Sequence, residues 1–256
     1  MDLGHVLTQY DSEVRARPQA QPGFEIERTG GVTRLTGHFN FICWWDLTPA
    51  TAREAVASQA AYFRSRGEEL IWRVYEHDKP AGLGNWLAEA GFEPEPPGTL
   101  MIFDLANQLE APVGPETEIR RVTTMADLQG FVEAAGAAFG QEESWRLAAY
   151  SSRLDDPNLG LYVALVSGKP VASARLEMAS PNFGFLFGGG VSPSYRRQGL
   201  YRALVAERAK EAKRRGCRYL STDARETSRP ILQNLGFICA ASETTWVLPG
   251  RSGNRN

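Results

Sequence analysis

Apolar positions along the chain follow the periods of both helices and strands. Segments 127–140 (DLQGFVEAAGAAFG) and 142–157 (EESWRLAAYSSRLDDP) repeat apolar residues every three to four positions, which predicts two amphipathic helices. The run at 159–178 (LGLYVALVSGKPVASARLEM) predicts two strands joined by a turn at 167–169, and 183–191 (FGFLFGGGV) predicts a third strand. Mixed elements of this kind predict an α/β or α+β fold, a sheet covered by helices on both faces.

Two segments at an offset of 149 residues are similar: 52–67 (AREAVASQAAYFRSRG) and 201–216 (YRALVAERAKEAKRRG). Each is followed by a predicted strand, by a short helix that ends in Gly-Phe (91–92 and 236–237) and by a β-rich segment. Two copies are too few for a solenoid, so we expect a duplicated α/β domain. The second half is expected to run helix, helix, three strands, helix, strand, helix and two short strands.

Proline and glycine residues interrupt this pattern in LEAPVGPET, residues 109–117. We therefore predict a first domain at 1–110 and a second domain at 117–249. The first domain is expected to begin with an amphipathic helical arm at 1–17, which docks onto the residues that follow it.

Charge and composition exclude several classes of function. The chain has 256 residues with 28 basic and 30 acidic side chains, and this balance provides no global field for nucleic acid or an anionic membrane. No apolar run reaches the roughly 20 residues of a membrane helix, and the first residues contain no signal-peptide stretch. Cys43, Cys217 and Cys239 lack metal-ligand spacing. We expect a cytoplasmic monomer or homodimer without a metal.

The most informative segment is 188–205, GGGVSPSYRRQGLYRALV, which joins the glycine-rich strand to a basic helix. This helix is expected to begin near Gln198 to Leu200, so its first N–H groups face the turn and attract an anion. Gly199 allows close approach to the main chain, and nearby arginines suit a diphosphate. The alternative is a glycine turn that enters a surface helix with solvated arginines. The segment contains neither a P-loop nor a G-x-G-x-x-G motif.

At this segment the chain resembles the GNAT family of acyl-CoA-dependent N-acetyltransferases. The family pattern is V-x-P-x-[YW]-[RQ]-x-x-G-x-[GA], and residues 191–201 read VSPSYRRQGLY. The resemblance extends over about 118–248, including the downstream L-G-F at 235–237. It implies two GNAT-like domains, each a mixed, mostly antiparallel sheet flanked by helices. The first domain is expected to be a degenerate copy, because it lacks the basic pair and the glycine of the turn.

The resemblance also implies a reaction, in which acetyl-CoA is the co-substrate and a small-molecule or peptide amine is the acceptor. A backbone N–H of the glycine-rich strand is expected to hold the developing oxyanion. One departure from the pattern is a bulky tyrosine at the start of the helix, where the family usually has glycine or alanine. The residues assigned to the coenzyme are Gly189, Gly190, Val191, Arg196, Arg197, Gln198, Gly199, Leu200, Tyr201 and Arg202.

The groups that move protons are less well defined by the sequence. Asp223 and Glu177 lie near strand ends and are candidate general bases, although a carboxylate there is more often a cap or solvated. Candidate donors or relays are Ser228, Thr222 and Tyr195. Leu232 stands where the family often has the tyrosine that protonates the leaving thiolate, and a leucine cannot donate a proton. The alternative function is a coenzyme A-binding regulatory or interaction module without turnover.

Overall fold

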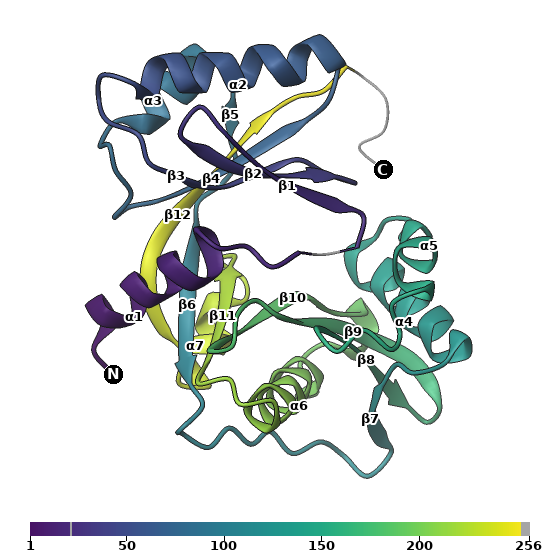
Figure 1. Ribbon diagram of the computed structural model, residues 1–256. Helices are drawn as coiled ribbons and strands as arrows, with labels where there is room; N and C mark the ends of the chain where they lie inside the picture. Colours follow the sequence, from purple (N-terminus) through teal and green to yellow (C-terminus); the bar gives the residue numbers. More distant parts are fainter. Residues whose placement is uncertain (21, 252–256) are drawn as a thin grey trace. The chain divides into compact units, whose positions relative to one another are not determined.

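The computed structural model describes residues 1–20 and 22–251 and divides them into two compact units. The first unit comprises Met1–Met101, Asp223–Pro230 and the chain from Ile238, and the second comprises Ile102–Thr222 and Ile231–Phe237. In each unit, helices pack against a sheet (Figure 1). The units differ from the domain bounds 1–110 and 117–249, because the last strand of the chain pairs within the first unit. As bounds of the duplicated sequence, those ranges stay a prediction.

The first unit is built on a mixed sheet in which strands follow the order β1-β2-β3-β4-β12, with β5 also on β12. The β3–β4 pair is parallel, and the other pairs are antiparallel. The elements are α1 (Leu3–Tyr10), the π-helical turn η1 (Asp11–Arg15), β1 (Phe24–Thr29), β2 (Val32–Gly37), β3 (Phe41–Trp45), α2 (Ala52–Arg66), β4 (Leu70–Tyr75), α3 (Leu83–Glu89), β5 (Glu93–Pro94), β6 (Gly98–Asp104) and β12 (Ile238–Leu248). The last three residues of β6, from Ile102, belong to the second unit.

The core of the first unit lies between α2 and its sheet. Helix α2 buries Val56, Ala60 and Phe63, which recur at three- and four-residue intervals on one face. Trp45 and Trp72 pack in this core with ring centroids 5.6 Å apart. The expected N-terminal arm is helical, and its buried residues are on one side of α1.

The second unit is built on a sheet in the order β11-β10-β9-β8-β7, in which only β10 and β11 are parallel. The predicted turn at 167–169 is confirmed as the β8–β9 hairpin. The elements are β7 (Thr117–Arg121), α4 (Met125–Phe139), α5 (Trp145–Ser151), β8 (Leu159–Val166), β9 (Lys169–Met178), β10 (Phe183–Val191), the 3-10 turn η2 (Pro193–Tyr195), α6 (Leu200–Arg214), β11 (Tyr219–Ala224) and α7 (Arg229–Asn234). The last two residues of β11 and the first two residues of α7 belong to the first unit.

The expected order of elements in the second half needs two corrections. A further strand, β7, precedes the first helix; its sequence TEIRR is mostly polar because β7 is an edge strand paired only with β8. The expected pair of short C-terminal strands is one long strand, β12, whose polar residues Glu243 and Thr244 continue the ladder with β4. Apolar alternation alone identifies neither strand.

Helices α4 and α6 pack on opposite faces of the sheet in the second unit (Figure 1). On the α6 face, Gly184 of β10 lies against Ala212, and on the α4 face Gly190 of β10 lies against Ala138. Strand β10 is therefore enclosed between the two helices. Within the described residues, no helix combines the length and the apolar character needed to cross a bilayer.

Candidate functional site

Strand β10 contains a β-bulge in its glycine-rich part. Phe187 lies opposite Arg175 of β9 and Gly190 lies opposite Ser173, so β10 has one extra residue between these pairs. Gly188 in the bulge has φ +52°, and a Cβ added there would meet no atom within 4 Å. The bulge therefore requires glycine and leaves the main chain open to an approaching ligand.

Beyond the bulge, β10 continues without its parallel neighbour. The β10–β11 pairs join Phe183–Phe185 to Tyr219–Ser221, and the Thr222 hydroxyl donates to the Leu186 carbonyl at 2.9 Å. Among the described residues, 187–191 have no ladder partner on β11. The edge of β10 on this side can therefore offer main-chain N–H and C=O groups to an extended ligand.

The turn after β10 leads into α6 with two residues in the left-handed region. Arg197 has φ +63° and Gly199, the N-cap of α6, has φ +83°. No side chain caps this helix, so its first N–H groups and the positive end of its dipole point into the turn. A Cβ at Gly199 would meet only the Pro112 carbonyl oxygen, at 3.7 Å. This geometry suits an anion.

The arginines of the turn have different roles. Arg196 donates from Nε to the Val191 carbonyl at 3.2 Å and from Nη2 to the Ala138 carbonyl at 3.3 Å, so it ties the turn to β10 and α4. Arg197 and Arg202 have exposed side chains, as does Gln198. Arg197 and Arg202 can therefore approach an anion at the helix N-terminus, whereas Arg196 fixes the main chain.

The bulky tyrosine at the helix start is accommodated by a glycine on β10. A Cβ at Gly189 would lie 3.0 Å from Cε2 of Tyr201, so the ring occupies the space that a side chain would need. Leu200, by contrast, is buried in the core. On the α4 face, a Cβ at Gly190 would lie 2.8 Å from both the Ala138 Cβ and the Phe139 Cζ. Each of the consecutive glycines Gly188, Gly189 and Gly190 therefore meets a different steric or conformational requirement.

Both candidate bases are in ion pairs with arginines. Glu177 of β9 lies 3.2 Å from Nε of Arg175. Asp223 belongs to the first unit, where it accepts hydrogen bonds from Arg73 and, at 3.1 Å, from the Tyr75 hydroxyl. The two carboxylates are therefore engaged rather than free, and a catalytic role for each stays a prediction.

The remaining proton-transfer candidates mostly satisfy local hydrogen bonds. Ser228 donates to the Arg225 carbonyl at 3.2 Å, and the Thr222 hydroxyl donates to the Leu186 carbonyl. Tyr195 is half-buried, with the Lys169 ammonium 5.9 Å from its ring centroid. Leu232 of α7 is 1% exposed and belongs to the core. At position 232 the structure offers packing and no proton donor.

On the α4 face, aromatic side chains lie close to the bulge. Phe139 and Trp145 are 43% and 49% exposed, and the ring of Phe139 stands over Gly190. Arg175, whose guanidinium lies 4.5 Å from the ring centroid of Phe187, donates to the Tyr150 hydroxyl. Sequence patterns did not single out Arg175 or Tyr150, because their partners are distant along the chain.

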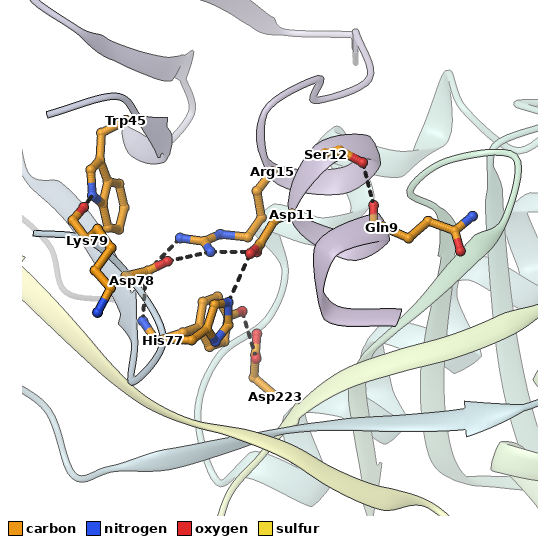
Figure 2. A network of polar contacts seen from close by, with 10 residues as sticks. Gln9, Asp11, Ser12, Arg15, Trp45, His77, Asp78, Lys79 and Asp223 are labelled. Atoms are coloured by element: carbon orange, nitrogen blue, oxygen red, sulfur yellow. Dashed lines mark hydrogen bonds and ion pairs between the residues drawn. The ribbon is translucent and has the colours of Figure 1, made fainter. Parts of the chain in front are cut away.

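A further polar cluster lies in the first unit (Figure 2). Asp11, His77 and Asp78 place ligand atoms within 4.8 Å of one another, the kind of grouping that can hold a metal ion. The Arg15 guanidinium lies among them and donates at 2.7 Å to both Asp11 and Asp78. A cation of the protein itself therefore neutralises these carboxylates.

Comparisons with known proteins agree with this geometry. Residues 127–237 match the model of the acetyltransferase (GNAT) family. No curated protein sequence gives a significant match. Among solved structures, a GCN5-related N-acetyltransferase from Kribbella flavida is 18% identical with a TM-score of 0.74, covering 96% of this chain and 95% of its own. A tandem GNAT protein from the clavulanic acid biosynthesis pathway is 15% identical with a TM-score of 0.64, covering 99% and 97%.

The solved structures confirm the predicted fold class. The match to the family model supports acyl transfer from acyl-CoA as the general activity. The match to the family model covers the bulged strand, the turn and helix α6. The structural similarity extends over the whole chain and includes a protein with two such domains. Residues 127–237 are therefore similar to the GNAT acetyltransferase family, and the whole chain shares the fold of solved GNAT proteins.

Proposed function

We propose that the second unit binds acetyl-CoA and transfers its acetyl group to a primary amine of a small molecule or peptide. The observation that supports this most is the bulged, partly unpaired strand β10, which leads through a glycine turn into the uncapped N-terminus of α6. Together these two features offer main-chain groups to one extended ligand.

In this proposal the turn binds the diphosphate of the coenzyme. The N–H groups at the start of α6 donate to its oxygens, and Gly199 keeps the approach open. Arg197 and Arg202 add positive charge from exposed positions, and Arg196 holds the turn to Val191. The pantetheine arm then runs along residues 187–191 of β10.

The chemistry requires a neutral amine and a stabilised oxyanion. A lysine-like amine, with a pKa of about 10.4, must lose a proton before it attacks the thioester carbonyl. Glu177 and Asp223 remain our candidates for accepting that proton, directly or through water. The N–H of Gly190 or Val191 holds the oxyanion while the new C–N bond forms and the C–S bond breaks. Because Leu232 cannot donate a proton, the thiolate is protonated by water or leaves as the anion.

Release of free thiol tests this function directly. Purified protein is incubated with acetyl-CoA and a panel of amines, and thiol is followed with a chromogenic disulfide. We expect amine-dependent release that is abolished by Gly199→Pro, because proline fixes φ near −65° where the turn needs +83°. The matched control Gly168→Ala, at a hairpin glycine with φ +79°, should retain release. Tight binding of acetyl-CoA without release by any amine would instead identify a non-catalytic binding module.

We also propose where the protein works and in which oligomeric state. We expect a cytoplasmic monomer or homodimer that needs no metal ion and binds neither nucleic acid nor membranes. Light scattering in solution gives the oligomeric state, and activity in the presence of a chelator tests the independence from metal.

A further inference from the structure

Arg208 is a buried arginine on the face of α6 that packs against β10. Its side chain is 1% exposed. The guanidinium donates from Nε to the Leu204 carbonyl at 2.9 Å, and from Nη1 to the Arg175 carbonyl at 3.0 Å and the Phe187 carbonyl at 3.4 Å. Arg208 therefore links α6 to strands β9 and β10 at the position where the bulge of β10 begins.

The charge of Arg208 is balanced by main-chain carbonyls and not by an acidic side chain. Among the residues that the structure describes, no carboxylate forms an ion pair with it, and three carbonyl oxygens accept its hydrogen bonds. Burial lowers the pKa of Arg208 to about 10, which still leaves the group protonated at neutral pH. Burying an unpaired charge is costly, so its presence points to a specific use.

Residues 188–190, the glycine segment, need hydrogen bonds from other elements to hold their conformation. Gly188, Gly189 and Gly190 have no side chains to restrict their dihedral angles, so hydrogen bonds from other elements must hold their peptide planes. Arg208 binds the carbonyl of Phe187 immediately before this segment, and Arg196 binds the carbonyl of Val191 immediately after it. The three glycines therefore lie between two carbonyl groups that arginines hold.

The hydrogen bond from Arg208 to the Phe187 carbonyl also fixes the direction of the next N–H group. The C=O of one residue and the N–H of the next point in opposite directions across a trans peptide. Since the Phe187 carbonyl accepts a hydrogen bond from Arg208 of α6, the Gly188 N–H points away from that guanidinium. Arg208 also lies close behind the segment, with Nη2 3.5 Å from the position of a Cβ on Gly189.

We propose that Arg208 is a positioning residue for acyl transfer. It holds the glycine bulge from the α6 side, so that the following N–H groups stay directed at the thioester carbonyl, and its unpaired charge adds positive potential where the oxyanion develops. This inference rests on the proposed function.

The test measures polarisation of the bound thioester, which needs no knowledge of the acceptor. Infrared difference spectra are recorded with acetyl-CoA carrying ¹³C at the acetyl carbonyl, free and bound to the wild-type protein, Arg208→Met, Arg208→Lys and the control Lys210→Met. Lys210 lies on the same helix and is exposed, so its substitution removes a positive charge without touching β10. Arg208→Gln replaces Arg208→Met if the latter does not fold by circular dichroism.

We expect the carbonyl band to move to lower frequency on binding to the wild-type protein and to Lys210→Met. Arg208→Met or Arg208→Gln should lose at least about half of this shift, and Arg208→Lys should retain more of it, while the Kd for coenzyme A changes by less than about threefold. With a competent amine, the same neutral variants should lower kcat by about tenfold or more at a similar KM for acetyl-CoA.

An unchanged band shift in the folded neutral variant would overturn the role of Arg208 while leaving the proposed function intact. A loss of coenzyme A affinity that accounts for the whole effect would also overturn it, because Arg208 would then support binding alone. A wild-type protein that binds no coenzyme A would contradict the proposed function itself, so the two failures can be told apart.

Discussion

Replacing Gly199 with alanine tests the anion turn with a perturbation of one methyl group. Gly199 has φ +83°, a conformation that costs an L-residue about 1–2 kcal/mol. The added Cβ meets no steric obstacle, since its closest neighbour is the Pro112 oxygen at 3.7 Å. The effect of Gly199→Ala therefore arises from backbone strain and from the methyl group lying beside the bound anion.

The magnitude follows from the main-chain donors at the helix start. If the strained turn relaxes by rotating its peptides, one hydrogen bond to a charged acceptor is lost, at about 1.5–3 kcal/mol. Since about 1.4 kcal/mol corresponds to a tenfold change, the Kd for coenzyme A should rise about 10- to 100-fold. The free energy of unfolding should fall by about 1–2 kcal/mol.

Gly168→Ala is the matched control, because Gly168 has φ +79° and a Cβ there would meet nothing within 4 Å. Urea unfolding and calorimetric titration with coenzyme A are measured on both variants. Each should lose similar stability, and only Gly199→Ala should lose affinity. Equal affinities in the two variants would refute a diphosphate bound at this turn.

Three further predictions concern the supports of the site and of the N-terminal arm. Arg196→Ala removes the hydrogen bonds to Val191 and Ala138, so coenzyme A affinity should fall severalfold in calorimetry; a change in stability alone would limit Arg196 to folding. Gly190→Ala places a Cβ 2.8 Å from the Ala138 Cβ, so urea unfolding should show a loss of about 1–3 kcal/mol, and no loss would mean that α4 moves freely. The hydrogen bond with Asp11 raises the pKa of His77 above 6.5; burial opposes ionisation of Asp11, but His77 and Arg15 outweigh it and lower its pKa below 3.8. The stability that this pair contributes should be complete between about pH 3.8 and 6.5. It should be lost as the pH rises through the folded pKa of His77, or as the pH falls through that of Asp11. Hydrogen exchange of the α1 amides measures this stability, and His77→Phe should remove the loss at high pH.

Local patterns predicted the elements of the site well. The strand at 183–191, the turn at 167–169 and a helix beginning near Leu200 are all in the structure. Their signals are short-range: apolar periodicity, a glycine at the turn and the spacing between them. The repeated Gly-Phe ends of two short helices are also confirmed, and both glycines have positive φ.

Features that depend on long-range pairing could not be predicted. The bulge at Gly188 follows from register with β9, and the sequence shows only three glycines there. The partner of Asp223 is Arg73, 150 residues away. Arg208 did carry a local signal, because it interrupts an otherwise apolar stripe of α6 between Leu204 and Ala212, but its acceptors on β9 and β10 appear only in the fold.

We propose that the turn before α6 binds the diphosphate of coenzyme A with its main-chain amides. A crystal structure of the protein with coenzyme A tests it most directly. We expect diphosphate oxygens about 2.7–3.2 Å from N–H groups at the start of α6, with the pantetheine arm along residues 187–191 of β10. Coenzyme A bound elsewhere, or a turn filled by the protein's own side chains in the presence of saturating ligand, would rule out this binding mode.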